Sequence, residues 1–531
     1  RGFLPEAILI GFAGEHQILG TPDHKSARKI SYVFPKEARE HHGAVVINYS
    51  NGPPLNCNKV GEYTKWGKHL DKAVYDVGIS VVRAAGNSRG PNGDLADDPK
   101  EGGPKHGPCQ ADLESLPHQV AKNDIAVGNW GLMDDLNCGA ANTLCNTSAA
   151  GPSADGRLKP DVVAPGQGIY TTTVAARQGF SYTAFGGTSA AAPVTSGVIG
   201  QIYDAFRSAT VPRDVLNIPP ATPKAILIHT ARDVGPPGPD YFHGWGLING
   251  ASAVRVALHH DKYLHEATVT ASGPDVHHFD VTGNVYSFKV TLVWDDPPAG
   301  NSETPTLQND LDLMVTDPSG GKTYFPFDTR LSSPRLISKI RLQEALQGAK
   351  VCASLLCRDR VNNVEQVLIT DPTGAALPTG TWTATVSAHR LVEDEQRFSL
   401  VVTPTECPVH IYNSTTLAGP VTCAAQPLEP VAVSIESDNV ALNCNDQAIK
   451  GAGRRAADYL GRHTGIYTER TGVTISNCKV KKFDVGIGLT GGNNSIITGN
   501  NIEETNMGIQ VDASREGGMT ALSVTKNTIL D

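Results

Sequence analysis

The chain of 531 residues has few aromatic side chains, no long apolar run and no excess of positive charge. Aromatic residues make up only 6%, whereas Gly (54) and Pro (35) are plentiful, a composition that suits many turns and short strands. No stretch of about 18 consecutive apolar residues occurs, so the sequence predicts no membrane-spanning helix. The 45 Lys and Arg against 54 Asp and Glu give a net charge of −9, which argues against nucleic acid as a partner.

The ten cysteines lack the paired spacing of a zinc site. Cys138 and Cys145 are seven residues apart, and Cys352 and Cys357 are five apart, each pair in a loop-like segment. We predict local disulfides Cys138–Cys145 and Cys352–Cys357, and an extracellular or cell-surface location. Two glycosylation triplets agree with this compartment, at residues 146–148 and 413–415.

Residues 1–262 alternate strand-like and helix-like segments. Continuous apolar runs at residues 44–50, 79–87 and 125–128, separated by amphipathic stretches, predict a parallel sheet covered by helices on both faces. In such sheets, functional residues gather at the carboxyl ends of the strands. Candidate positions at two of these ends are Ser50, Asn51, Gly52, Gly86 and Asn87.

The rest of the chain is predicted to be all-β. Period-two alternation, as in residues 286–294 and 381–386, predicts an antiparallel β-sandwich over residues 263–404. Residues 405–435 carry several Pro, Thr and Ala and are predicted to be a linker.

Residues 436–531 repeat with a period near 22, since Ile475, Ile497 and Val524 open similar Asn-containing stretches. This period predicts a parallel β-helix whose coils stack their Ile and Val side chains. The last coil has no cap and the chain begins at Arg1 without Met, so we expect both ends to be cut.

The string Gly-Gly-Thr-Ser-Ala-Ala-Ala-Pro at residues 186–193 is the most informative motif. A tight Gly-Gly turn delivers Ser189 to the predicted start of a helix, where its N–H is among the unpaired donors of the first turn. Ser189 is therefore placed both to attack a carbonyl and to stabilise the resulting oxyanion. Thr and Ser are also common helix N-caps, but the whole string favours the nucleophile.

This string resembles the nucleophile motif of subtilisin-like serine peptidases, the subtilases. Three further segments resemble parts of that family. Residues 159–166 resemble the segment that leads into the nucleophile, residues 84–87 the oxyanion strand, and residues 46–52 the strand that pairs with substrate. The resemblance covers residues 1 to about 260 and implies a subtilisin-like domain that hydrolyses peptide bonds of proteins through an acyl-enzyme at Ser189. Asn87 would be the amide donor of the oxyanion hole.

The resemblance also implies a substrate cleft for a protein or peptide. Its predicted lining comprises Ser50, Asn51, Gly52, Ala84, Ala85 and Gly86. Small residues there keep the cleft open, and the strand ends would pair with an extended peptide backbone.

The triad Asp and His of the family have no matching string in this sequence. Residues 1–7 resemble the stretch that normally follows the histidine helix, so we expect both residues to lie upstream of Arg1. None of the nearby histidines has the helix-start context of the general base: His16, His24, His41, His42 and His69. Without a base, the chain is expected to lack efficient turnover.

The 263–404 sandwich resembles the jelly-roll-like domain of some subtilases in the runs at residues 294–297, 309–313 and 362–365. Asp295, Asp296, Asp310 and Asp312 are candidate ligands of a structural calcium ion, or else turn caps. The chemistry itself requires no cofactor.

Two other functions are kept open. The first is a binding or scaffold protein whose peptidase domain is degenerate. The second is a carbohydrate-binding surface protein that works through the β-helix, since the repeats resemble right-handed β-helix modules of carbohydrate-active and surface proteins.

Overall fold

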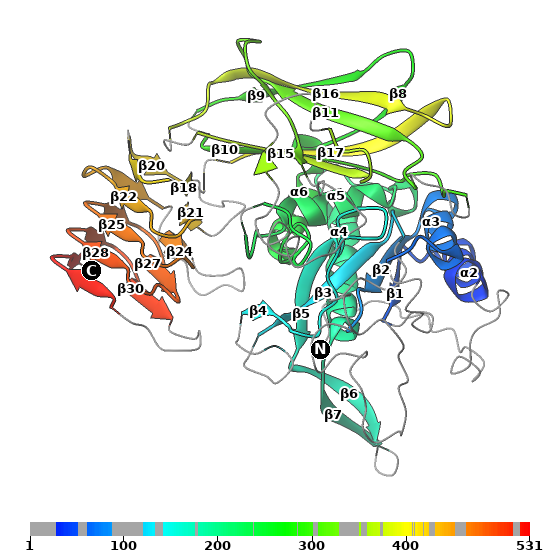
Figure 1. Cartoon of the computed structure of the whole chain (residues 1–531), viewed down its shortest axis with the longest axis horizontal. Helices are drawn as coiled ribbons and strands as arrows, with labels where there is room; N and C mark the ends of the chain where they lie inside the picture. The colour runs from blue at the N-terminus through cyan, green and yellow to red at the C-terminus, as the bar shows by residue number, and fades with distance from the viewer. Residues whose placement is uncertain are drawn as a thin grey trace.

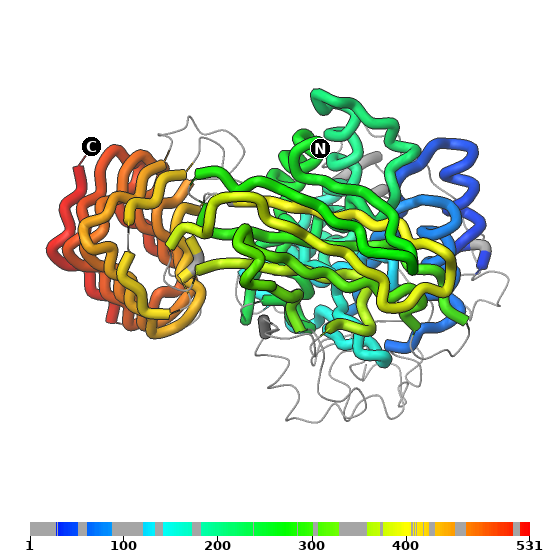
Figure 2. The backbone as a smooth tube through the Cα atoms, turned by 90° about the horizontal axis from the view of Figure 1, so that it is seen from above, coloured from blue at the N-terminus to red at the C-terminus, as the bar shows by residue number. Residues whose placement is uncertain are grey.

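The computed structural model consists of an α/β domain, a β-sandwich and a β-helix, with the β-helix at one end of the molecule (Figures 1 and 2). The residues it describes are 28–50, 61–87, 121–132, 138, 142–175, 179–236, 238–283, 285–300, 306–328, 350–351, 358–371, 375–405, 407, 409–411, 413–417, 419–423, 431–451, 463–512 and 521–530.

The α/β domain is built on a parallel sheet in the order β1-β2-β3-β5, with β4 antiparallel to β3. Its strands are β1 (Val46–Tyr49), β2 (Ser80–Ala84), β3 (Ile125–Gly131), β4 (Thr143–Leu144) and β5 (Val162–Gln167). β2 and β3 are buried on both faces and mostly apolar, as predicted, with Ser80, Arg83 and Asn129 as buried polar exceptions.

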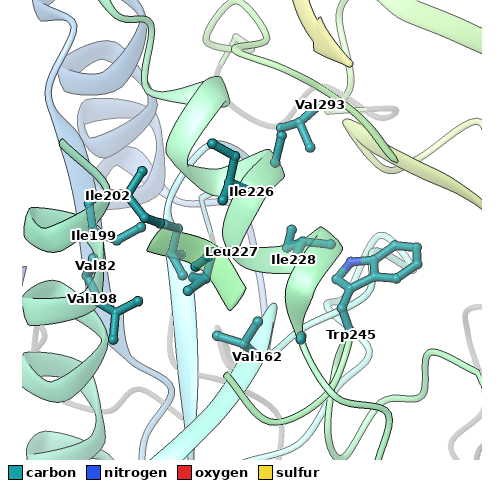
Figure 3. Packing of buried hydrophobic residues seen from close by; sticks show 14 of the residues in the cluster. Val82, Val162, Val198, Ile199, Ile202, Ile226, Leu227, Ile228, Trp245 and Val293 are labelled. Atoms are coloured by element: carbon teal, nitrogen blue, oxygen red, sulfur yellow. The ribbon is translucent and has the colours of Figure 1, made fainter. Parts of the chain in front are cut away.

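Helices cover both faces of this sheet. Because successive strand residues point to opposite sides, neighbouring residues of β2 pack against different helices. On one face, Val81 packs in a cluster with Leu70 and Trp66 of α3, whereas Val82 joins α4 and α5 on the other (Figure 3). The helical elements are η1 (Lys29–Val33), α2 (Phe34–His42), α3 (Lys65–Val77), α4 (Thr188–Ser208), η4 (Val215–Asn217), α5 (Ala221–Thr230), α6 (Gly250–Leu258) and α7 (His260–Tyr263).

An antiparallel hairpin of β6 (Ile169–Ala175) and β7 (Gly179–Phe185) projects from the domain and leads directly into α4 (Figure 1).

The sandwich consists of two antiparallel four-stranded sheets, in the orders β15-β10-β17-β8 and β12-β11-β16-β9. Trp294, Trp382, Phe288 and Phe398 are fully buried between the sheets. The strands are β8 (Leu264–Thr270), β9 (Asp275–Val281), β10 (Ser287–Trp294), β11 (Asp310–Thr316), β12 (Thr323–Tyr324), β15 (Val364–Thr370), β16 (Gly380–Arg390) and β17 (Glu395–Thr405), with a separate pair β13 (Phe327–Asp328) and β14 (Lys350–Val351).

The α/β domain packs against the β15-β10-β17-β8 sheet of the sandwich in one hydrophobic cluster, and the sandwich has a second core between its own sheets. Val293 of β10 lies in the same cluster as Ile226 of α5 and Val198 of α4 (Figure 3). Polar contacts frame this junction: the Lys122 ammonium lies 3.0 Å from Asp71 and 3.3 Å from Asp296, with all three side chains fully buried. The sandwich is therefore joined to the α/β domain by both apolar packing and a buried ion pair.

The β-helix has three parallel sheets, each of five strands, one from every coil. Ile475, Ile497 and Val524 stand in register, as do Ile466, Ile487 and Ile509, which confirms the predicted repeats. The three sheets are β18 (Val409–Ile411), β21 (Val431–Ile435), β24 (Thr464–Thr468), β27 (Val485–Thr490) and β30 (Met507–Asp512); β19 (Thr415–Thr416), β22 (Ala441–Asn443), β25 (Thr474–Ser476), β28 (Ile496–Thr498) and β31 (Ser523–Thr525); and β20 (Val421–Thr422), β23 (Ala448–Lys450), β26 (Lys479–Lys481), β29 (Asn501–Glu503) and β32 (Thr528–Leu530).

The segment 405–435, predicted as a linker, instead contributes the first coil of the β-helix. Its strands β18, β19 and β20 pair with β21, β22 and β23. The prediction is wrong because strands of two or three residues among Pro and Thr carry too little apolar periodicity to be recognised. A disulfide between Cys407 and Cys423 joins the start of this coil to its end.

Two further disulfides lie in the described residues. Cys138–Cys145 confirms a predicted pair, whereas Cys352–Cys357 lies outside the described residues. Cys444–Cys478 links two successive coils of the β-helix. The following coil contacts the same position through an asparagine side chain, because Asn500 Oδ1 accepts a hydrogen bond from the Cys478 N–H at 2.9 Å.

We predict that Gly486→Ala destabilises the β-helix by about 1–3 kcal/mol, because extra atoms in a packed interior force neighbours apart. A Cβ at this position would stand 2.4 Å from the Ile502 side chain and 2.5 Å from the Gly508 carbonyl of the next coil. The measurement is chemical denaturation followed by a probe in the β-helix.

Gly488→Ala, two residues along the same strand, is the matched control. Its nearest neighbours would lie 3.3 Å away, so it should cost much less. Equal losses in the two variants would contradict the stacking argument.

Candidate active site

Ser189 is the second residue of α4 and lies at the end of the Gly186–Gly187 turn. Gly187 has φ +91° and ψ 177°, a backbone conformation that favours glycine. Pro193 sits inside the helix four residues later and has no N–H, so the Ser189 carbonyl receives no helical hydrogen bond from it. Ser50 Oγ donates to that carbonyl at 2.9 Å instead. In return, Ser189 Oγ donates to the Ser50 carbonyl at 2.7 Å, so the end of β1 and the start of α4 are tied together.

Asn87 is fixed beside this turn by Thr188. The Thr188 N–H and Thr188 Oγ1 both donate to Asn87 Oδ1 at 2.9 Å, and the Gly86 N–H donates to Thr188 Oγ1 at 3.1 Å. Because two donors occupy the carbonyl end of the amide, Nδ2 is the end that remains to donate. Among the residues that the structure describes, Nδ2 has no acceptor.

The other predicted cleft residues differ in what their backbones can offer. The Ala85 N–H donates to the Val127 carbonyl at 3.0 Å, and the Gly86 carbonyl accepts from the Ala149 N–H at 2.9 Å. These groups are used inside the domain, so Ala85 and Gly86 place Asn87 rather than present free backbone groups. Ala84 ends β2, and Asn51 and Gly52 lie outside the described residues.

No imidazole is hydrogen-bonded to Ser189 within the described part of the chain. His41 and His42 are exposed at the end of α2, and His69 lies in α3. His16 and His24 lie outside the described residues.

Several supporting residues were not singled out from the sequence. Thr188 orients Asn87, and Gln167 Oε1 accepts from the Gly187 N–H at 3.3 Å. Asn48 Nδ2 donates to Ser50 Oγ at 2.9 Å and Asn48 Oδ1 accepts from Ser196 Oγ at 3.2 Å. Only Thr188 carried a sequence signal, because it directly precedes the nucleophile in the motif.

The four aspartates considered for calcium have protein partners. Asp310 and Asp312 pair with Arg360 at 3.0 and 2.8 Å, and burial raises the pKa of Asp310 to about 7 against the effect of Arg360. In the described residues, no three His, Cys, Asp or Glu side chains are grouped to hold a metal ion.

Asp295 and Asp296 dock the sandwich on the α/β domain. Asp295 Oδ2 accepts from the Ala221 N–H at the start of α5 at 3.0 Å, and burial raises the pKa of Asp295 to about 7. Asp296 accepts from the Asn309 N–H at 2.7 Å and pairs with Lys122. These two carboxylates therefore serve as docking contacts between the sandwich and the α/β domain.

Comparison with known proteins gives the family of the first domain. The model of the subtilase family matches residues 1–246, and that of the right-handed β-helix region matches residues 435–531. The chain contains a subtilase domain. Its parallel sheet and the helix that carries Ser189 belong to that domain, and the last four coils belong to the matched β-helix region.

Among curated proteins, the chain is similar to the serine protease/ABC transporter B family protein tagA of Dictyostelium discoideum. The identity is 26% over 287 residues, which is 48% of this chain and 15% of that protein. The chain thus spans about a seventh of the length of this relative.

Similar solved structures include the patellamide maturation protease PatA, at 20% identity, covering 44% of this chain and 69% of that chain with a TM-score of 0.29. MycP1 from the ESX-1 type VII secretion system is 22% identical, with 43% and 55% covered and a TM-score of 0.29.

No helix in the described residues combines the length and the apolar character needed to cross a membrane.

Proposed function

We propose that the subtilase domain is a serine-type endopeptidase with Ser189 as its nucleophile and proteins or peptides as its substrates. The observation that carries the proposal is the pair of hydrogen bonds from Thr188 to Asn87 Oδ1, which leaves Asn87 Nδ2 as a donor beside Ser189.

In the proposed reaction, Ser189 Oγ leaves the Ser50 carbonyl and attacks the carbonyl carbon of the scissile peptide bond. A general base takes the Ser189 hydroxyl proton as the Oγ–C bond forms, and the new oxyanion accepts hydrogen bonds from the Ser189 N–H and Asn87 Nδ2. The C–N bond then breaks, the base passes the proton to the leaving amine, and water hydrolyses the acyl-enzyme that remains. These donors act because they are fixed before charge develops.

The second candidate is a degenerate subtilase domain that binds without cleaving. It is favoured by one observation, that the Ser189 hydroxyl donates to a main-chain carbonyl rather than to a base among the described residues. Ser189 needs a general base to lose its proton efficiently, so reactivity at this residue decides between the candidates.

The test is labelling of the natural protein with a fluorophosphonate probe. We expect one label on Ser189, located by peptide mapping, and none in Ser189→Ala, because only an activated serine attacks the probe. Circular dichroism of both proteins is the control for folding. A folded wild type that stays unlabelled would sink the peptidase proposal in favour of the degenerate domain.

We further propose an extracellular or cell-surface location, supported by the three disulfides in the described residues. The proposed partner of the β-helix is a glycan or a cell surface, which a glycan array probed with the whole protein tests.

A further inference from the structure

Asn129 carries a buried carboxamide that no other described group satisfies. It is the fifth residue of β3, and it is 0% exposed. Its backbone is paired, since its N–H donates to Ser148 Oγ and its carbonyl accepts from the Cys145 N–H, both at 2.9 Å. Neither Oδ1 nor Nδ2 has a hydrogen-bond partner among the residues that the structure describes. Because buried amides are nearly always hydrogen-bonded, this one calls for a reason.

The carboxamide lies under the first turn of the helix that carries Ser189. Ile125 and Val127, at alternate positions of β3, pack against α4, and Asn129 continues this face at the carboxyl end of the strand. A Cβ on Gly166 would stand 2.4 Å from Asn129 Oδ1, 2.7 Å from the Gly187 carbonyl oxygen and 2.8 Å from Ala191 Cβ. The amide, the Gly187 carbonyl and the first turn of α4 therefore meet at one point, which a glycine leaves open.

The same turn is held from two other directions by carboxamides. Gln167 Oε1 accepts from the Gly187 N–H at 3.3 Å, and Asn87 Oδ1 accepts from the Thr188 N–H at 2.9 Å. Glycine adopts the Gly187 conformation without steric cost, so the orientation of this peptide is set by the hydrogen bonds around it. The Gly187 carbonyl accepts from the Ala190 N–H and so starts the helix, and it is the group that Asn129 adjoins.

We infer that Asn129 is a positioning residue for Ser189. A half-turn of the amide about its last torsion exchanges Oδ1 and Nδ2, and Nδ2 then faces the Gly187 carbonyl as a donor. That contact fixes the plane of the Gly187 peptide, and with it the direction of the Thr188 and Ser189 N–H groups. The effect on catalysis rests on the proposed peptidase function, whereas the contact itself does not.

The test is Asn129→Leu, which keeps the size of the side chain and removes both polar atoms. Because the Gly187 carbonyl would lose one donor, we expect a slightly lower melting temperature. Amide hydrogen exchange should become faster in the peptide covering residues 186–190, whereas an amide without a role could be replaced with no change in exchange there. The rate of fluorophosphonate labelling at Ser189 should fall about tenfold, because small displacements of a reacting group cost rate steeply.

Asn129→Asp, which keeps the shape and the acceptor but has no donor when ionised, should slow labelling in the same way. Asn501→Leu is the matched control, because Asn501 Oδ1 in the β-helix is also buried without a partner among the described residues. This variant should leave exchange at residues 186–190 unchanged.

Exchange and labelling that both stay at wild-type values in Asn129→Leu would overturn the inference. A wild type that does not label would defeat the proposed function alone, because hydrogen exchange needs no catalytic activity and still decides whether Asn129 holds the turn.

Discussion

Asn87→Ala should lower kcat by about 10²–10³, a size known from subtilisin itself when its oxyanion donor is removed, with little change in KM. The reason is that Asn87 Nδ2 would stabilise charge that exists only in the transition state. In the structure, the amide is already oriented by Thr188 and needs no rearrangement. The measurement is steady-state hydrolysis of a peptide ester by the natural protein.

Thr188→Val is the companion variant, because it removes the hydroxyl that donates to Asn87 Oδ1 but keeps the shape and the N–H. It should cost less than the loss of Asn87, and melting temperatures should show that both variants fold. If Asn87→Ala retained the wild-type kcat, another group would have to supply the donor, and the role assigned to Asn87 would be wrong.

Asp124→Asn should destabilise the α/β domain by about 3–5 kcal/mol, the cost of leaving buried charges without their partner. Asp124 is fully buried and pairs with Arg83 at 2.8 Å and with Lys159 at 2.9 Å. Asp161 pairs with Lys159 at 2.6 Å and with Lys224 at 3.1 Å. In the variant it would be the remaining carboxylate of this cluster, against the three cations Arg83, Lys159 and Lys224. Urea denaturation at neutral pH gives the loss directly.

The ion pairs of Asp124 also make the stability of the α/β domain depend on pH in the acid range. Burial alone would raise the pKa of Asp124, but Lys159 and Arg83 outweigh burial and hold this pKa well below its ordinary value. The stabilisation by Asp124 is therefore complete above the pKa of an ordinary aspartate and is lost as the pH falls below that pKa. At such pH the unfolded chain binds a proton at Asp124, whereas in the folded chain Asp124 stays ionised. Asp124→Asn should lack this part of the acid slope.

Glu40→Gln provides the contrast, since Glu40 pairs with Lys36 on the exposed surface of α2 at 3.6 Å. Surface pairs of this kind contribute about 0–1 kcal/mol. A loss in Asp124→Asn no greater than that in Glu40→Gln would show that the buried cluster is not required for the fold.

The sequence predicted the parts of the molecule that depend on local patterns. Apolar runs of β2 and β3 indicated the parallel sheet, and the spacing of Ile475, Ile497 and Val524 indicated the β-helix. The motif around Ser189 brought Asn87 into the argument, and both lie at the same turn.

Features that depend on distant parts of the chain could not be predicted. Asp295 and Asp296 looked like oxygen ligands because the sequence does not show that Ala221 and Lys122, far earlier in the chain, reach them. The first coil of the β-helix was missed because its strands gain their order from pairing with the second coil. Asn129 reads as an ordinary polar residue in a strand until its burial under α4 is known.

The apolar cluster shared by the α/β domain and the sandwich determines how the chain comes apart. Val293, Val364 and Val401 of the sandwich belong to the same apolar cluster as α4 and α5, so unfolding of either part exposes apolar surface of the other. The β-helix contacts the α/β domain through polar links such as Arg232 with Glu469 and Arg470 with the Gly235 carbonyl. Tyr286, directly before β10, packs in the core of the β-helix, so the β-helix is joined to the sandwich by apolar contact and to the α/β domain by polar contacts. We expect heating to melt the α/β domain and the sandwich together, and the coils farthest from Tyr286 to loosen first and leave Ser189 in place.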